Sequence, residues 1–113
     1  EFLNNDYLNF IDTFRNLIKD EKCVQQFTDD NAIPYLVNKP TCTKYFVNAH
    51  IIKNWTEDNF IKELDNAKPN FIVYSSNINW FKDRMNAPNA DKYILDNYYL
   101  FKDLSPWIIY KKN

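Results

Sequence analysis

The sequence predicts a single three-layer α/β domain over residues 1–113, with a mostly parallel mixed sheet and a C-terminal antiparallel hairpin. Up to about residue 97, β-favouring runs alternate with amphipathic runs, which is typical of strand–helix–strand units. Residues 71–74 are apolar at every position, as expected of a central strand that helices cover on both faces. Residues 98–102 and 107–111 are β-rich, and the connection between them is too short for a crossover.

Local sequence patterns predict the positions of the other helices and strands. Apolar side chains recur at three- and four-residue steps over residues 3–18, which predicts an amphipathic helix. Residues 23–27 and 43–48 are short β-favouring runs and are the first two expected strands. Further helices are expected at residues 56–68, around 80–85 and around 93–94.

A short helix is expected between the first two strands, at residues 33–37. Pro34 is tolerated in the first turn of a helix, whereas Pro40 prevents the helix from continuing. The side chains expected to point inward are Ile33, Tyr35, Leu36 and Val37.

Composition excludes several classes of function. Fourteen basic and fifteen acidic residues leave a net charge of −1, so nucleic acid is not an expected partner. Glycine is absent, which removes the dinucleotide-binding GxGxxG motif, the P-loop and the GxSxG nucleophile elbow. One histidine and the lack of a closely spaced cysteine pair argue against a structural zinc site. We therefore expect neither a metal nor a cofactor.

Polar residues that follow the expected strands are the candidate binding residues. They are Asp29, Asp30, His50, Ser75, Ser76 and Asn77. The carboxyl ends of parallel strands meet at one edge of a sheet, so these residues would form a polar rim where open α/β sheets bind ligands. The same residue types are ordinary helix caps and turn residues, which is the structural alternative. A hydrolase built on Asp29, Asp30 and His50 would require their side chains to converge within hydrogen-bond reach.

The two cysteines, Cys23 and Cys42, open the first two expected strands. Neighbouring strands can bring Cα atoms within the ~4.4–6.8 Å that a disulfide requires. A pair of reduced, buried thiols is the alternative, and these residues alone do not decide between the two.

The order of the segments resembles the soluble C-terminal domain of bacterial polytopic membrane glycosyltransferases. These are relatives of the dolichyl-phosphate-mannose protein mannosyltransferases and the lipid A aminoarabinose transferases. The resemblance lies in the strand at residues 23–27, the Tyr35-Leu36 step, the Thr-containing run at 41–46, the run at 68–73 and the Tyr-rich hairpin at 98–112.

The resemblance implies a non-catalytic accessory domain outside the cytoplasmic membrane, excised from a longer protein and resting on a membrane-embedded portion of the same polypeptide. That portion would use a polyprenyl-phosphate-linked sugar, and the domain would shape access for a glycan acceptor. No catalytic residue is carried over, because the catalytic carboxylate of the family lies on membrane segments. An extracytoplasmic location would also favour a bridge between Cys23 and Cys42. A freestanding soluble α/β binding module with no transferase activity is the alternative function.

Overall fold

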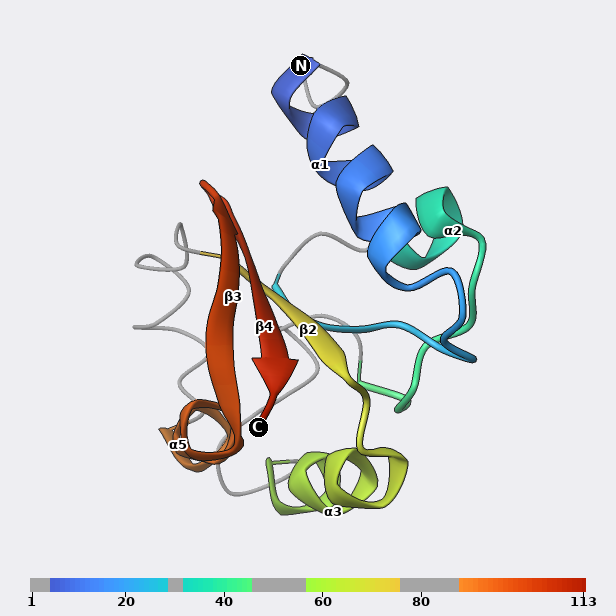
Figure 1. The fold of residues 1–113 in the computed structure, drawn as a ribbon. Coiled ribbons are helices and arrows are strands. Elements are labelled where there is room, and N and C mark those ends of the chain that lie inside the picture. Colours follow the sequence, from blue (N-terminus) through green and yellow to red (C-terminus); the bar gives the residue numbers. More distant parts are fainter. Residues whose placement is uncertain (1–4, 29–31, 46–56, 76–87) are drawn as a thin grey trace.

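A computed structural model describes residues 5–28, 32–45, 57–75 and 88–113, and it places helices on both faces of one mixed sheet (Figure 1). The strand order across the sheet is β1-β2-β4-β3. The elements in chain order are α1 (Asn5–Leu17), β1 (Gln25–Phe27), α2 (Ile33–Val37), α3 (Glu57–Ala67), β2 (Phe71–Ser75), α5 (Pro88–Asn97), β3 (Tyr98–Leu104) and β4 (Trp107–Lys112).

The sheet combines parallel and antiparallel pairing. β1 runs parallel to β2, whereas β4 is antiparallel to both of its neighbours, β2 and β3. The predicted α/β class, the mixed sheet and the C-terminal hairpin are therefore confirmed. The parallel share is smaller than expected, because β4 inserts between β2 and β3. Within the described strands, β1 and β2 form the one parallel pair.

The central strands contribute side chains to two hydrophobic cores, one on each face of the sheet. Val73 and Ile109 are paired in register and point to one face, whereas the neighbouring pair of Ile72 and Tyr110 points to the other. This alternation explains why residues 71–74 are apolar throughout. The core under α1 and α2 contains Tyr7, Phe10, Ile11, Phe14, Ile18, Val24, Ile33, Val37, Val73 and Ile109. The core under α3 and α5 contains Tyr45, Phe60, Leu64, Ile72, Ala90, Ile94 and Tyr98.

Helix α1 is held on the sheet by its aromatic face. The Phe10 ring stacks on Trp107 of β4 with the ring centroids 5.1 Å apart and an angle of 11° between the planes, and Tyr7 contacts the same indole at 5.2 Å. Phe14 is fully buried one turn further along the helix. Burying each such side chain contributes about 1.5–3 kcal/mol, so this face outweighs the modest intrinsic helix propensity of its aromatic residues.

Hydrogen bonds from basic side chains connect the segments that contain α1 and α2. Arg15 Nη2 donates to the Leu36 carbonyl at 2.8 Å. Lys39 Nζ donates to the carbonyls of Lys19, at 3.2 Å, and Glu21. Leu36 lies in the last turn of α2, where carbonyls lack partners within the helix, and Lys19 and Glu21 follow the end of α1. These hydrogen bonds fix the segment around α2 against α1.

The inward direction predicted for Tyr35 is wrong. Ile33 and Val37 are buried, but Tyr35 is 84% exposed. Residues 33 and 37 share a face of a helix with 3.6 residues per turn, whereas residue 35 lies nearly opposite to both. Since α2 packs through one face, it cannot turn all four apolar side chains inward, and Leu36 is only partly buried.

The strand expected at residues 43–48 is absent from its described part, because residues 42–44 form a bend and residue 45 belongs to no strand. Strand-like pairing of this segment with the start of β1 consists of a parallel bridge between Val24 and Thr41. The Thr43 hydroxyl accepts from the Tyr45 backbone N–H at 3.2 Å, a local turn contact that competes with strand pairing. Residues 46–48 and the helix expected around 80–85 lie outside the described residues.

Candidate functional site

The carboxyl ends of β1 and β2 lie side by side, as the polar-rim prediction requires. Phe27 of β1 is opposite Tyr74 of β2, so Thr28 and Ser75 follow at the same edge of the sheet. Ser75 also pairs with Trp107, so the hairpin turn lies at this end as well. The start of α1 and the tip of the β3–β4 hairpin are directed toward the same end of the molecule (Figure 1).

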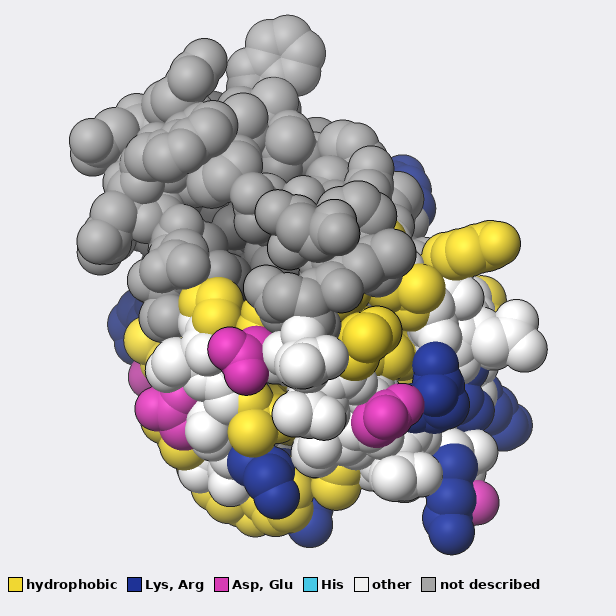
Figure 2. All heavy atoms as spheres, turned by 90° about the horizontal axis from the view of Figure 1, so that it is seen from above, with side chains coloured by type: hydrophobic (Ala, Val, Ile, Leu, Met, Phe, Trp, Pro, Cys, Tyr) yellow, Lys and Arg dark blue, Asp and Glu magenta, His cyan; other side chains and the backbone are white. Residues whose placement is uncertain are grey.

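Of the six candidate rim residues, the structure places Ser75, as the last residue of β2. The other five, Asp29, Asp30, His50, Ser76 and Asn77, lie outside the described residues. The rim therefore stays a prediction about those side chains, and so does the hydrolase alternative. Figure 2 views this end from above, and the described part of the face carries charges of both signs between hydrophobic side chains.

A carboxylate and two tyrosines gather next to this edge. The Tyr74 hydroxyl donates to Asp91 Oδ1, and the rings of Tyr74 and Tyr110 meet edge to face at 5.6 Å. Burial raises the pKa of Asp91. Burial also raises the pKa of Tyr110, and the nearby Asp91 carboxylate adds to this shift. The cluster therefore holds a half-buried carboxyl group whose hydrogen-bond donor is a tyrosine hydroxyl.

Nothing local in the sequence distinguishes Asp91 from an ordinary acid in the first turn of a helix. Its partner Tyr74 is 17 residues away in the chain. The contact depends on the packing of α5 against the sheet, which no local pattern reports.

A second carboxylate, Glu57, is buried and joins two helices. It opens α3, and its Oε2 accepts from the backbone N–H groups of Asn89, at 2.6 Å, and Ala90, at 2.9 Å. These donors belong to the first turn of α5, where helix N–H groups lack internal partners and carry partial positive charge. Glu57 is therefore a structural cap for α5 from another helix.

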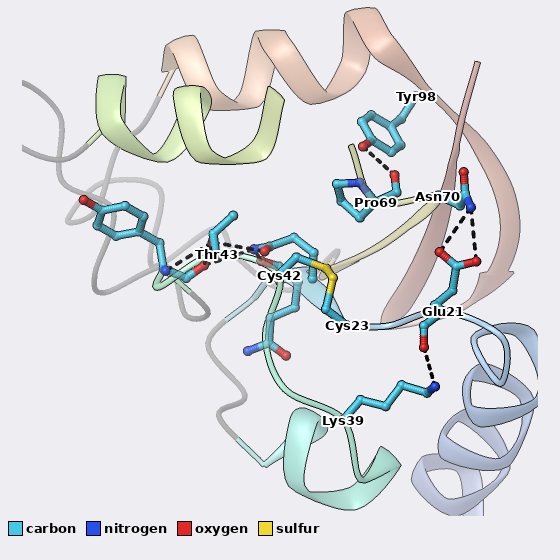
Figure 3. The surroundings of a disulfide bond; sticks show 11 residues. Glu21, Cys23, Lys39, Cys42, Thr43, Pro69, Asn70 and Tyr98 are labelled. Atoms are coloured by element: carbon cyan, nitrogen blue, oxygen red, sulfur yellow. Dashed lines mark hydrogen bonds between the residues drawn. A yellow bond between two sulfur atoms is a disulfide. The ribbon is translucent and has the colours of Figure 1, made fainter. Parts of the chain in front are cut away.

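At the opposite end of β1, Cys23 and Cys42 form a disulfide with a Cα–Cα distance of 4.9 Å (Figure 3). The bond lies beside the bridge between Val24 and Thr41, where the Cys42 N–H donates to the Val24 carbonyl at 2.9 Å. It therefore ties the start of β1 to the segment that follows α2.

Buried polar groups beside the disulfide are paired with one another. Gln25 Nε2 donates to the Tyr45 carbonyl at 3.0 Å, and Gln25 Oε1 accepts from the Thr43 hydroxyl at 3.0 Å. On the outer side, the Asn70 amide donates to both carboxylate oxygens of Glu21 at 3.1 Å (Figure 3). These contacts hold the backbone in place and indicate a structural role for this end.

A tyrosine pair lies where α3 and α5 approach the start of β2. The Tyr93 hydroxyl donates to Asp65 Oδ1 at 2.9 Å, and the Tyr98 hydroxyl donates to the Pro69 carbonyl at 2.7 Å. Burial, assisted by the Asp65 carboxylate, raises the pKa of Tyr93 to about 12. Burial likewise raises the pKa of Tyr98.

Two negative findings concern the described ranges alone. No group of three or more His, Cys, Asp and Glu side chains there is arranged to hold a metal ion. No helix within these ranges combines the length and apolar character of a membrane span.

Comparison with known proteins gives a likeness among solved structures. No model of a known protein family matches this sequence. No curated protein matches it either. Among solved structures, the chain is similar to the C-terminal globular domain of an oligosaccharyltransferase from Archaeoglobus fulgidus, with a TM-score of 0.61 and 11% sequence identity. The likeness covers 98% of this chain and 99% of that one, so the two share a fold from end to end.

The similar structure is archaeal and belongs to neither of the families named from the sequence. At 11% identity the likeness shows a shared fold, and it does not support the bacterial assignment.

Proposed function

We propose that this chain is a non-catalytic accessory domain of a membrane glycosyltransferase that uses a polyprenyl-phosphate-linked sugar. The observation that carries the proposal is the end-to-end likeness to one globular domain of an oligosaccharyltransferase. The likeness spans nearly the whole of both chains, so the correspondence is between complete domains and not between shared substructures. The segment order, which resembles another group of membrane glycosyltransferases, supports the same class of parent protein.

The principal partner in this proposal is the membrane-embedded portion of the same polypeptide. The disulfide between Cys23 and Cys42 supports an extracytoplasmic location, since such bonds persist mainly in oxidising compartments. The polar rim beyond β1 and β2 is our candidate for contact with the lipid-linked sugar or the glycan acceptor. In this role the domain shapes access to a reaction centre that other residues supply.

The test combines the complete reading frame with a transfer assay. We expect the frame to encode several membrane spans before this domain, and the parent protein to transfer sugar from a polyprenyl-linked donor. The 113-residue chain alone should transfer none. Sugar transfer by the isolated chain would overturn the accessory role. A frame that encodes only this domain would also overturn it, in favour of a freestanding binding module.

A further inference from the structure

A hollow of about 270 Å³ lies beside α2. Its described lining is Pro34, Tyr35, Asn38, Lys39 and Pro40. At 84%, Tyr35 has the largest exposed fraction of any large hydrophobic side chain in the described ranges. Within those ranges its ring contacts no other aromatic ring, and its hydroxyl makes no hydrogen bond. The exposed rings of Tyr99 and Phe101 differ in this respect, because they contact each other at 6.5 Å.

The support under Tyr35 is held rigidly. The disulfide closes the segment that contains α2. Arg15 of α1 binds the Leu36 carbonyl, and Lys39 binds the carbonyls of Lys19 and Glu21, which follow α1. Asn38 ends the helix in the left-handed conformation, with φ 58°, which Asn tolerates better than most residues. An aromatic ring presented on a fixed backbone loses little conformational entropy when a ligand binds to it. The exposed ring is therefore well prepared for binding.

We propose that this hollow binds one uncharged sugar ring of a glycan. Tyr35 and the two prolines offer apolar surface to the C–H face of a pyranose. The Asn38 side-chain amide is exposed and, among the described residues, has no hydrogen-bond partner. It supplies both donors and an acceptor, which matches sugar hydroxyls that do both.

The volume of the hollow and the charge of its lining indicate which class of ligand it binds. Pockets for drug-sized ligands occupy roughly 300–1,000 Å³, so a hollow below that range suits a single ring. Its one described cation, Lys39, already binds the carbonyls of Lys19 and Glu21, which argues for a neutral sugar over an anionic one. The inference rests on the proposed function, which it deepens by naming a glycan as the ligand of the domain.

The experiment is an NMR titration of the 113-residue chain with mannose, N-acetylglucosamine and short oligomers of each. We expect chemical-shift changes centred on Tyr35 and Asn38. Tyr35→Ala should weaken binding by about tenfold, whereas Tyr35→Phe should retain most of the affinity because the stacking face remains. Asn38→Gly removes the amide while keeping the left-handed backbone accessible, and should also weaken binding.

Tyr99→Ala is the matched control, because it removes another exposed tyrosine from a different surface. An equal loss of affinity in this variant, or no shift with any of the sugars, would overturn the inference. Shifts at Tyr35 with a proline-rich peptide but not with sugars would also overturn it, since aromatic and proline-lined grooves bind such peptides.

The two proposals fail separately. Sugar binding at Tyr35 in a chain whose reading frame encodes no membrane spans would overturn only the accessory role. A parent glycosyltransferase whose domain binds no sugar at Tyr35 would overturn only this inference.

Discussion

Removing the disulfide between Cys23 and Cys42 should lower the free energy of unfolding by about 3 kcal/mol. The two cysteines are 19 residues apart, and the chain-entropy estimate for a closed loop of that length is about 3 kcal/mol. At about 2.1 cal/mol/K per residue, the unfolding entropy of 113 residues is about 0.24 kcal/mol/K. The expected fall in Tm is therefore about 12 °C.

Thermal unfolding followed by circular dichroism measures this change in two independent ways. The wild-type chain with reducing agent and the double variant Cys23→Ser, Cys42→Ser should melt at nearly the same temperature. Reducing agent should leave the Tm of the double variant unchanged. This measurement controls for any effect of the reducing agent other than cleavage of the disulfide. Two titratable thiols in the unreduced, denatured wild type, or a Tm shift of less than about 2 °C, would refute the reasoning.

Three buried or partly buried groups give further tests. Glu57→Gln should lower the free energy of unfolding in urea by about 1–2 kcal/mol, because it removes the charge at the N-terminus of α5. Asp58→Asn, at an exposed acid in the same turn, should change it by less than about 0.5 kcal/mol. Burial raises the pKa of Asp91 above its ordinary 3.8, so the folded state holds this proton more tightly and stability falls as pH rises above that value. Asp91→Asn should reduce that slope in urea denaturations at a series of pH values. The pKa of Tyr93 is raised from 10.0 to about 12, so stability should fall as pH rises between those values, and Tyr93→Phe should lessen the fall.

Each of these predictions has an outcome that would contradict it. Equal losses for the substitutions at Glu57 and Asp58 would mean that the contact with α5 contributes nothing. An unchanged pH slope in the Asp91 variant would show that this carboxyl titrates alike in the folded and unfolded states. A tyrosinate absorbance titration in which all tyrosines ionise near pH 10 would contradict the burial of Tyr93.

Local periodicity was sufficient for much of the fold. The all-apolar run at residues 71–74 predicted a strand between two cores, and the structure places Ile72 and Val73 in opposite cores. The four-residue connection after the first β-rich run predicted the hairpin. Both features depend on residues that are close in sequence, so a pattern of side chains reports them directly.

Long-range contacts were not predictable in this way. Glu57 binds the N-terminus of α5 across 32 residues, and its own surroundings show only a first-turn acid. For the rim, strand pairing brings Thr28 and Ser75 to one edge, as expected from two parallel strands. Tyr35 is exposed because α2 packs through one face, and apolar composition alone does not predict which residues lie on that face.

The position of β4 has a consequence for biosynthesis. A chain leaves the ribosome with its N-terminus first, so β1, β2 and β3 are all synthesised before the strand that connects β2 to β3. Until residues 107–112 emerge, β3 lacks the partner that it has in the sheet, and Val73 lacks Ile109 beside it in the core. The complete sheet therefore assembles only after this segment has been made. Until then the edge of β2 that pairs with β4 has no partner strand, and an unpaired strand edge is a site where another chain can pair.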